Sequence, residues 1–213
     1  MTIYKTRMGK TKQLGLAALM ALGVLGFAAS SRAAESGDCI RGQAAAPIKI
    51  EVFSDFQCPA CRAFYLETIK QVMTEYGDTG KACIAYREFP LSMHAHAKKA
   101  ARYGHAALKI STQLWSQVAD ALFQNQDAWA ATGDIEAALA KTVSAKDLAA
   151  IKKLVAAPAA LDAAIEADIK LGMEKELTST PTFFVTAAGK TEKVPGAIRF
   201  PILKRYLDTR PAQ

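Results

Sequence analysis

The chain has 213 residues, of which 51% are hydrophobic and 22% are charged. This length and composition allow one substantial hydrophobic core and exclude a disordered chain. The formal net charge is +7, but five of the 27 basic residues and none of the 20 acidic residues lie within residues 1–33. The rest of the chain therefore carries 22 basic against 20 acidic residues, without a basic stripe that has aromatic residues between the charges. These features exclude a nucleic-acid partner.

Residues 1–33 have the pattern of a secretory signal peptide. Basic residues at positions 5–12 precede an uncharged apolar run at residues 14–29, and small residues follow before Ala34. The apolar run is short for a membrane span. We expect the signal peptide to be cleaved, which leaves residues 34–213 as a secreted protein. The alternative is an uncleaved N-terminal membrane anchor.

All four cysteines lie beyond the leader, in a chain that is expected to enter an oxidising compartment. Two residues separate Cys58 from Cys61, whereas Cys39 and Cys83 stand alone. A zinc site would need a second pair of ligands at similar spacing, so we expect no metal site. We also expect no cofactor other than a redox-active disulfide.

A strand, a cysteine and a helix are predicted in succession after residue 47. Residues 48–53 form a β-branched and apolar run of strand length. Pro59 suits the first position of a helix, which places Cys58 at the helix N-terminus. After a turn at residues 77–80, a second strand is predicted over residues 82–89. This order predicts a parallel pair of strands with a right-handed crossover.

Residues 92–177 are rich in alanine and have a different character from the first half of the chain. Apolar residues recur at helical spacing from Leu114 onward, and Ser144 with Asp147 resembles a capping box. We predict an all-helical insertion over this region. Its apolar stripes could also form a cofactor or partner surface, but packing among the inserted helices is the more common reason for such stripes.

Strand character returns at residues 182–186, and a turn at Gly189, a short second strand and a terminal helix follow. We therefore predict one α/β domain over residues 34–213. Its core comprises residues 47–91 and 178–210, with the helical insertion between them.

The spacing of Cys58 and Cys61 suits thiol-disulfide exchange. Exchange needs one accessible cysteine of low pKa that attacks a disulfide, and a second cysteine within reach that resolves the mixed disulfide. Free N–H groups and the helix dipole at the first turn would stabilise a Cys58 thiolate, whereas Cys61 would be screened from solvent one turn later. We expect Cys58 to attack and Cys61 to resolve. The alternative is a structural or reduced buried pair.

Thr180 and Pro181 directly precede the third predicted strand. A proline at this position suits a turn or a cis peptide bond. We predict a cis Thr180–Pro181 bond, which could bring the Thr180 backbone toward Cys58 and offer it to an extended peptide. The alternative is an ordinary proline that begins a strand.

Three segments resemble the DsbA-like family of thioredoxin-fold thiol-disulfide oxidoreductases, in particular its branch with the motif Ser-Asp-Phe-x-Cys-Pro-x-Cys. They are residues 51–61, 86–91 and 180–185. The resemblance covers most of the chain after the leader and implies a thioredoxin fold, in which the helical insertion is the hallmark of the family. By this resemblance, Cys58 and Cys61 match the redox pair, and Thr180-Pro181 matches the cis-proline loop.

The active-site loop contains Pro59 and Ala60, and it departs from that of the most oxidising relatives at Ala60. Those relatives place a histidine at the position of Ala60, where its charge favours the thiolate, so we predict a less oxidising pair here. The threonine before Pro181 is similar to that of isomerase and reductase relatives. The resemblance also suggests Glu51 as the buried carboxylate that moves protons for Cys61, although one extra residue separates Glu51 from the motif.

The resemblance implies a periplasmic enzyme. We expect a monomer that donates its Cys58–Cys61 disulfide to unfolded or reduced secreted proteins through a mixed disulfide, and that a membrane redox partner reoxidises. One alternative is a periplasmic disulfide reductase or isomerase that a membrane donor keeps reduced. The other is a non-catalytic peptide-binding protein or chaperone that uses the groove near Thr180-Pro181.

The two remaining cysteines suit a structural disulfide. Cys83 lies on the second predicted strand, and an edge strand that contains Cys39 could pair alongside it. We predict a Cys39–Cys83 bond that stabilises the fold by a few kcal/mol. Two free thiols are the alternative.

Overall fold

The computed structural model describes residues 1–3 and 39–210. The apolar run and the cleavage site of the predicted signal peptide lie outside these residues. The contacts group Ala33–Gln213 in one compact unit, to which all the elements below belong. Within the described residues, no helix is both long enough and apolar enough to span a membrane.

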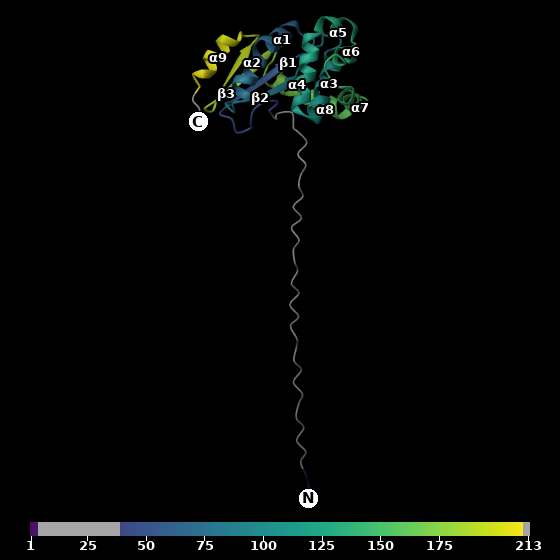
Figure 1. The fold of residues 1–213 in the computed structure, drawn as a ribbon. Coiled ribbons are helices and arrows are strands. Elements are labelled where there is room, and N and C mark those ends of the chain that lie inside the picture. The colour runs from purple at the N-terminus through teal and green to yellow at the C-terminus, as the bar shows by residue number, and fades with distance from the viewer. Residues whose placement is uncertain (4–38, 211–213) are drawn as a thin grey trace. The chain divides into compact units, whose positions relative to one another are not determined.

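The described residues form a four-stranded sheet in the order β2-β1-β3-β4 (Figure 1). Its strands are β1 (Ile48–Ser54), β2 (Ala82–Glu88), β3 (Thr182–Ala187) and β4 (Lys190–Pro195). β1 and β2 are parallel, while β1–β3 and β3–β4 are antiparallel. This arrangement confirms the predicted parallel pair and the predicted C-terminal hairpin.

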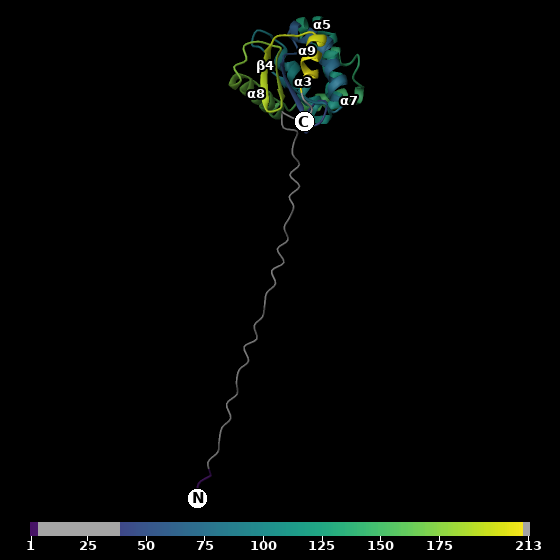
Figure 2. The ribbon, with the colours of Figure 1, turned by 90° about the vertical axis from the view of Figure 1, so that its left-hand side faces the viewer.

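One helical run connects β1 to β2 and covers one face of the sheet. It consists of α1 (Pro59–Phe64), η1 (Tyr65–Ile69), α2 (Lys70–Val72) and η2 (Met73–Gly77). η1 and η2 are π-helical turns, a detail that the sequence pattern does not predict. The C-terminal helix α9 (Phe200–Asp208) packs against η1 and α2, and Figure 2 shows it beside the edge of the sheet that β4 forms.

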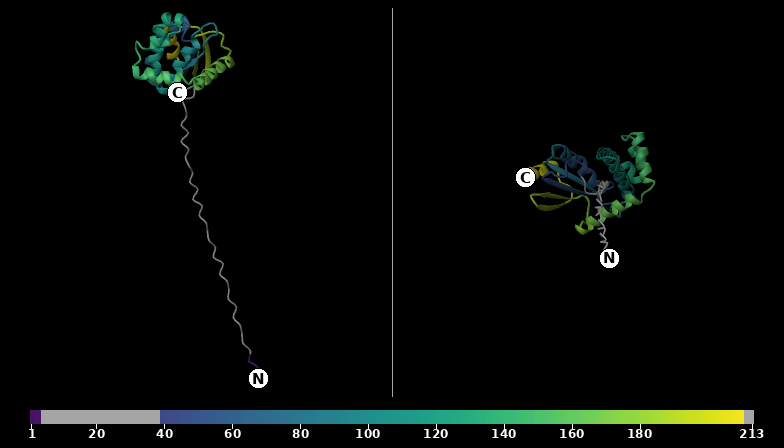
Figure 3. Two further views of the ribbon diagram at one scale, coloured as in Figure 1. Left: turned by 90° about the vertical axis from the view of Figure 1, so that its right-hand side faces the viewer. Right: turned by 90° about the horizontal axis from the view of Figure 1, so that it is seen from below.

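The helical insertion is confirmed. Six helices lie between β2 and β3, and they form a block beside the sheet (Figure 3). They are α3 (Ala97–Ile110), α4 (Thr112–Gln124), α5 (Gln126–Thr132), α6 (Ile135–Leu139), α7 (Ala145–Val155) and α8 (Ala159–Glu174). Ser144 caps the N-terminus of α7, because its side chain accepts a hydrogen bond from the backbone N–H of Asp147. The Asp147 carboxylate accepts from the Ser144 hydroxyl and not from the Ser144 N–H, so only half of the predicted capping box is present.

The sheet and the insertion share one hydrophobic core. Trp115 and Phe123 of α4 are at most 2% exposed, and their rings contact Tyr65, which lies on the helical run between β1 and β2. Burial of aromatic residues dominates core energetics, because each removes a large area from water. A smaller apolar cluster covers the opposite face of the sheet and consists of Phe53, Phe89, Leu177 and Phe184.

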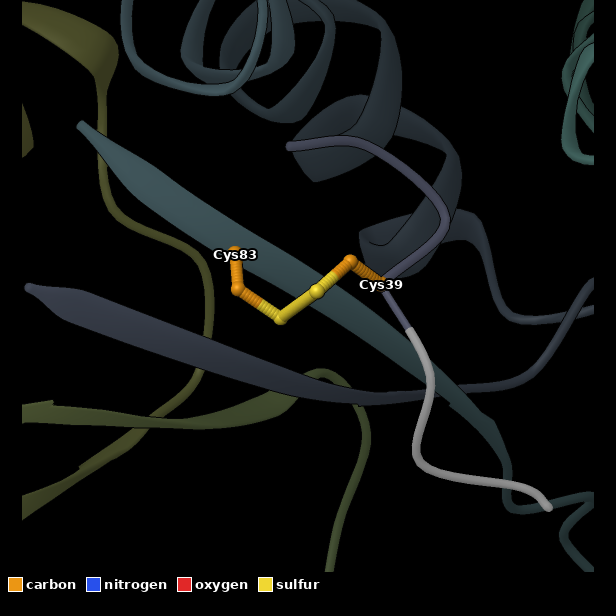
Figure 4. The surroundings of a disulfide bond; sticks show 2 residues. All are labelled: Cys39 and Cys83. Carbon is orange, nitrogen blue, oxygen red and sulfur yellow. A yellow bond between two sulfur atoms is a disulfide. The ribbon is translucent and has the colours of Figure 1, made fainter. Parts of the chain in front are cut away.

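The segment after residue 38 pairs with the outer edge of β2. The Ile40 N–H donates to the Ile84 carbonyl at 2.7 Å, and the Ile84 N–H donates to the Arg41 carbonyl at 2.9 Å. The Cys39–Cys83 disulfide joins the same two segments, as predicted (Figure 4). Gly42 lies so close to β2 that a Cβ atom there would be 1.9 Å from the Ala82 carbonyl oxygen, so only glycine fits this approach.

We expect this disulfide to contribute about 2–4 kcal/mol to the free energy of unfolding, because it closes a loop between residues 44 positions apart. The measurement is urea unfolding of a Cys58→Ala/Cys61→Ala variant with and without reductant, so that only the Cys39–Cys83 bond responds. A Cys39→Ser/Cys83→Ser variant in the same background should match the reduced sample. An unfolding midpoint that reductant leaves unchanged would contradict this contribution.

Candidate active site

Cys58 lies at the N-cap of α1, directly before Pro59 at the first helical position. A turn leads into it from β1, with the Cys58 N–H donating to the Asp55 carbonyl at 3.0 Å. The Cys58 carbonyl begins the helix by accepting from the Arg62 N–H at 3.1 Å. The predicted order of strand, cysteine and helix is therefore present.

The Thr180–Pro181 bond is cis, as predicted. The bend places the Thr180 carbonyl oxygen 3.4 Å from the Cys58 sulfur, which donates to it when the thiol is protonated. Cys58 is consequently only 6% exposed, so it is less accessible than the sequence-based expectation of an open attacking cysteine. A reacting partner must approach this sulfur beside the 180–181 segment.

The surroundings of Cys58 favour its thiolate and lower its pKa from 9.0 to about 5. The hydrogen bond from the Cys61 thiol contributes most to this lowering, and burial opposes it. The N–H groups of Ala60 and Cys61, at the start of the helix, also donate to the sulfur. The Thr180 hydroxyl acts in the same direction, although this buried hydroxyl has no hydrogen-bond partner among the described residues.

Cys61 has the opposite character. It is 1% exposed, and burial together with the neighbouring Cys58 raises the pKa of its thiol well above 9.0. The Asp55 N–H donates to its sulfur at 3.4 Å, and the Ser54 hydroxyl acts to lower the pKa of the thiol. One sulfur of the pair thus holds a negative charge at neutral pH while the other keeps its proton. Neither cysteine is part of a disulfide in this structure.

A buried carboxylate ties the active-site turn to the segment after β2. Asp55 accepts hydrogen bonds from the N–H groups of Gln57, at 2.7 Å, and Leu91, at 2.9 Å. One of its oxygens also lies 2.6 Å from Nδ1 of His94. Because an unpaired buried carboxylate is costly, these partners hold the turn in one conformation.

A buried amide from the helical insertion holds the same turn from the other side. Nε2 of Gln126, on α5, donates to the carbonyl oxygens of Phe56 at 2.7 Å and Cys58 at 3.1 Å. Gln126 is 3% exposed. The sequence analysis missed Gln126 and His94, because no local pattern indicates which inserted residues meet the turn.

The prediction for Glu51 is wrong. Glu51 pairs with Arg87 at 2.8 Å and with Lys175 at 2.7 Å. Successive strand residues point to opposite faces of a sheet, so Glu51 lies on the face opposite to Ser54, whose hydroxyl acts on the pKa of Cys61. The extra residue between strand and motif thus turns this carboxylate away from the cysteines.

Glu88 is the buried acid on the same face as Ser54, its register partner in the β1–β2 pair. Glu88 is 3% exposed, and its Oε1 atom has no hydrogen-bond partner. Burial raises the pKa of Glu88 well above 4.5, and the carboxylates of Asp168 and Asp55 raise it further. Glu88 is therefore a neutral acid held inside the protein, another residue that the sequence analysis did not identify.

Among residues 39–210, no group of three or more His, Cys, Asp or Glu side chains is arranged to hold a metal ion. The chemistry available at this site is that of the two sulfur atoms and their hydrogen-bond donors. The expectation of a redox disulfide without a further cofactor stays a prediction.

The comparison with known families agrees with this geometry. The thioredoxin family model matches residues 34–208, which is most of the chain. The protein therefore belongs to the thioredoxin family, and the resemblance found in the sequence is confirmed.

Individual relatives narrow the comparison to the DsbA-like fold. The crystal structure of α-DsbA1 from Wolbachia pipientis superposes with a TM-score of 0.65 at 23% identity and covers 80% of this chain and 88% of that one. The crystal structure of oxidised BdbD from Bacillus subtilis gives a TM-score of 0.64 at 18% identity and covers 81% of this chain and 95% of that one. A probable disulfide bond formation protein D of Bacillus cereus is 32% identical over 85 residues, which are 40% of this chain and 39% of that protein. The match thus spans about two fifths of that curated relative.

Replacing Cys61 should raise the pKa of Cys58, because the Cys61 thiol is the strongest of the groups that lower it. In a Cys61→Ala variant we expect the midpoint of the Cys58 titration to rise from about 5 by at least about one pH unit. A pH titration of the thiolate absorbance measures it. The Cys58→Ala variant is the control and should lose the acidic transition. An unchanged midpoint in Cys61→Ala would contradict the role of the second sulfur.

Glu88 should make the folded protein less stable as the pH rises. Its pKa is raised on folding, so the folded state keeps a proton that the unfolded chain loses above about pH 4.3. Stability should fall from there by about 1.4 kcal/mol per pH unit while Glu88 stays protonated. A Glu88→Gln variant should lose this dependence, so its stability relative to the unmodified protein should increase with pH in urea unfolding. Glu174→Gln, at an exposed position, is the control. If the stability of Glu88→Gln changed with pH in parallel with that of the unmodified protein, the assignment of Glu88 would be refuted.

Proposed function

We propose that the protein is an extracytoplasmic thiol-disulfide oxidoreductase that donates its Cys58–Cys61 disulfide to reduced proteins. The observation that carries this proposal is the unequal character of the two sulfurs. Cys58 has a pKa of about 5 beside the Thr180 carbonyl, while the pKa of the buried Cys61 is raised. A stable thiolate and a buried resolving thiol are what disulfide exchange requires.

The reaction begins when a substrate thiolate attacks the Cys58 sulfur of the oxidised protein. A substrate–Cys58 bond forms, the Cys58–Cys61 bond breaks, and its electron pair goes to Cys61, which takes up a proton. A second substrate thiolate then attacks the substrate sulfur and releases Cys58 as a thiolate. Two electrons pass to the protein. Of the two protons released by the substrate thiols, one ends on Cys61 and the other goes to solvent.

The low pKa of Cys58 favours the donor direction. A stabilised thiolate stabilises the reduced protein and makes its disulfide more oxidising. The thiols of the most oxidising enzymes of this kind have a pKa of about 3.5, so a pKa of about 5 supports a weaker oxidant, as Ala60 suggests. A reductase or isomerase that a membrane donor keeps reduced is the second candidate, which the threonine before Pro181 favours.

The backbone of Thr180 offers a place for the substrate chain, whereas the Pro181 carbonyl already accepts from the Gly196 N–H at 2.8 Å. An extended peptide can pair with a free backbone edge through main-chain hydrogen bonds, which select no particular sequence. This mode suits varied unfolded or reduced secreted proteins as substrates. Turnover as a donor then requires reoxidation, which we assign to a membrane redox partner acting on a monomer.

The oxidised protein should transfer its disulfide to a reduced, unfolded substrate protein. One Cys58–Cys61 bond should be lost for each disulfide that forms in the substrate. Cys58→Ala should abolish the transfer. Cys61→Ala should accumulate a mixed disulfide through Cys58 when it meets an oxidised substrate. Quantifying alkylated thiols and gel-shifted adducts measures both effects.

A Cys39→Ser/Cys83→Ser variant is the matched control and should keep the exchange activity, because its redox pair is intact. If the oxidised protein binds the unfolded substrate without any transfer, a peptide-binding protein replaces the proposed enzyme.

A further inference from the structure

Two buried hydroxyl groups, of Ser54 and Tyr86, are hydrogen-bonded to each other in the core that also contains Cys61. The Tyr86 hydroxyl donates a hydrogen bond of 2.6 Å to Oγ of Ser54. Ser54 is 1% exposed and Tyr86 is 6% exposed. They lie on neighbouring strands, where Tyr86 is the register partner of Val52 in the parallel β1–β2 pair.

Aromatic packing holds the Tyr86 ring in place. Its ring centroid lies 4.9 Å from that of Trp115, 6.3 Å from that of Tyr65 and 6.5 Å from that of Phe56. A buried tyrosine hydroxyl needs a hydrogen-bond partner, and here that partner is Ser54. The ring therefore has little freedom to turn its hydroxyl elsewhere.

The contact with Tyr86 determines how the Ser54 hydroxyl can be used. A serine hydroxyl has one proton to donate and two lone pairs that accept. Tyr86 occupies a lone pair of Ser54, so the Ser54 proton is free for another acceptor. Cys61 is the neighbouring acceptor, because the N–H of Asp55, the next residue after Ser54, lies 3.4 Å from the Cys61 sulfur. The Ser54 hydroxyl also acts to lower the pKa of the Cys61 thiol, which favours the thiolate.

The Asp55 N–H reaches the same sulfur at 3.4 Å, so two donors from consecutive residues converge on Cys61. The proximity is mutual, because the Cys61 charge raises the pKa of Tyr86 in turn, after burial. The strongest influences on the Cys61 thiol are burial, Cys58, the Ser54 hydroxyl and the Asp55 N–H, and none of them is a carboxylate.

We propose that Ser54, oriented by Tyr86, is a catalytic residue that donates a hydrogen bond to the Cys61 sulfur whenever that sulfur carries a negative charge. Tyr86 acts through Ser54 and is a positioning residue. This inference rests on the proposed exchange function. It concerns the two moments at which Cys61 is a thiolate, namely when it leaves the Cys58–Cys61 disulfide and when it attacks a mixed disulfide.

The hydroxyl pair gives up no proton in these steps. As the Cys58–Cys61 bond breaks, its electron pair moves to the Cys61 sulfur, and the Ser54 O–H and Asp55 N–H bond to the new anion. The proton that finally rests on Cys61 is one of those released by the substrate thiols. A raised pKa keeps the Tyr86 phenol protonated throughout.

The test measures the reactions of Cys58 and Cys61 separately. Reduced protein is mixed with Ellman's reagent, and the release of thionitrobenzoate is followed over time. Cys58 attacks first and releases thionitrobenzoate at a rate that depends on reagent concentration. Cys61 then attacks the mixed disulfide and releases a second thionitrobenzoate at a rate that does not. In Ser54→Ala, the second phase should slow by about tenfold to a hundredfold, because one hydrogen bond to an ionised group is lost. The pH profile of the second-phase rate should also move to higher pH. The first phase should stay within about twofold.

Three further variants make the test specific. Ser54→Thr keeps the hydroxyl and should restore the second phase, and Tyr86→Phe keeps the ring and should slow the second phase by about threefold to tenfold. Thr68→Val removes another buried hydroxyl, which bonds to the Ile198 carbonyl, and should leave both phases unchanged.

The outcomes distinguish this inference from the proposed function. A normal second phase in Ser54→Ala, or an equal slowing of both phases, would overturn the inference while leaving the exchange function intact. If Ser54→Ala does not fold, a normal second phase in Tyr86→Phe overturns it instead. Failure of the unmodified protein to release the second thionitrobenzoate would remove the proposed function, and the inference with it.

Discussion

Burial of the Cys61 sulfur one turn inside α1 is the constraint on which the chemistry of this protein depends. A thiolate is costly in that position, so Cys61 keeps its proton and donates it as a hydrogen bond to Cys58. Negative charge then gathers on Cys58, where the helix N–H groups also stabilise it. Asp55 and Gln126 hold the turn between β1 and α1 so that these donors stay aimed at the sulfur. Reactivity at Cys58 is thus a consequence of how well its neighbour is buried.

Much of the fold could be predicted from the sequence because the signals are local. The strand before Cys58, the proline that begins α1 and the serine that caps α7 each depend on residues a few positions apart. The cis bond before Pro181 and the Cys39–Cys83 disulfide were also predicted, because each follows from residue type and the expected strand positions. The face of the insertion that meets the turn could not be predicted in this way.

The errors and omissions concern side-chain positions and contacts that are determined only when the strands and helices come together. Side chains alternate across a strand, so a single extra residue before the motif places Glu51 on the far face and makes Ser54 the neighbour of Cys61. The contact between Ser54 and Tyr86 depends on the register of two parallel strands separated by a helical run, which no local pattern specifies. Glu88 owes its raised pKa to burial in the assembled core, which likewise appears only once the chain is folded.

The reduction potential of the Cys58–Cys61 pair, measured by equilibrating the protein with glutathione buffers and counting alkylated thiols, tests the donor assignment most directly. Strong oxidants of this kind have potentials of about −120 mV with a thiol pKa of about 3.5, and one pKa unit corresponds to about 30 mV. A Cys58 pKa of about 5 therefore predicts a potential of about −165 mV. A potential near about −270 mV would contradict the donor assignment and make the protein a reductase.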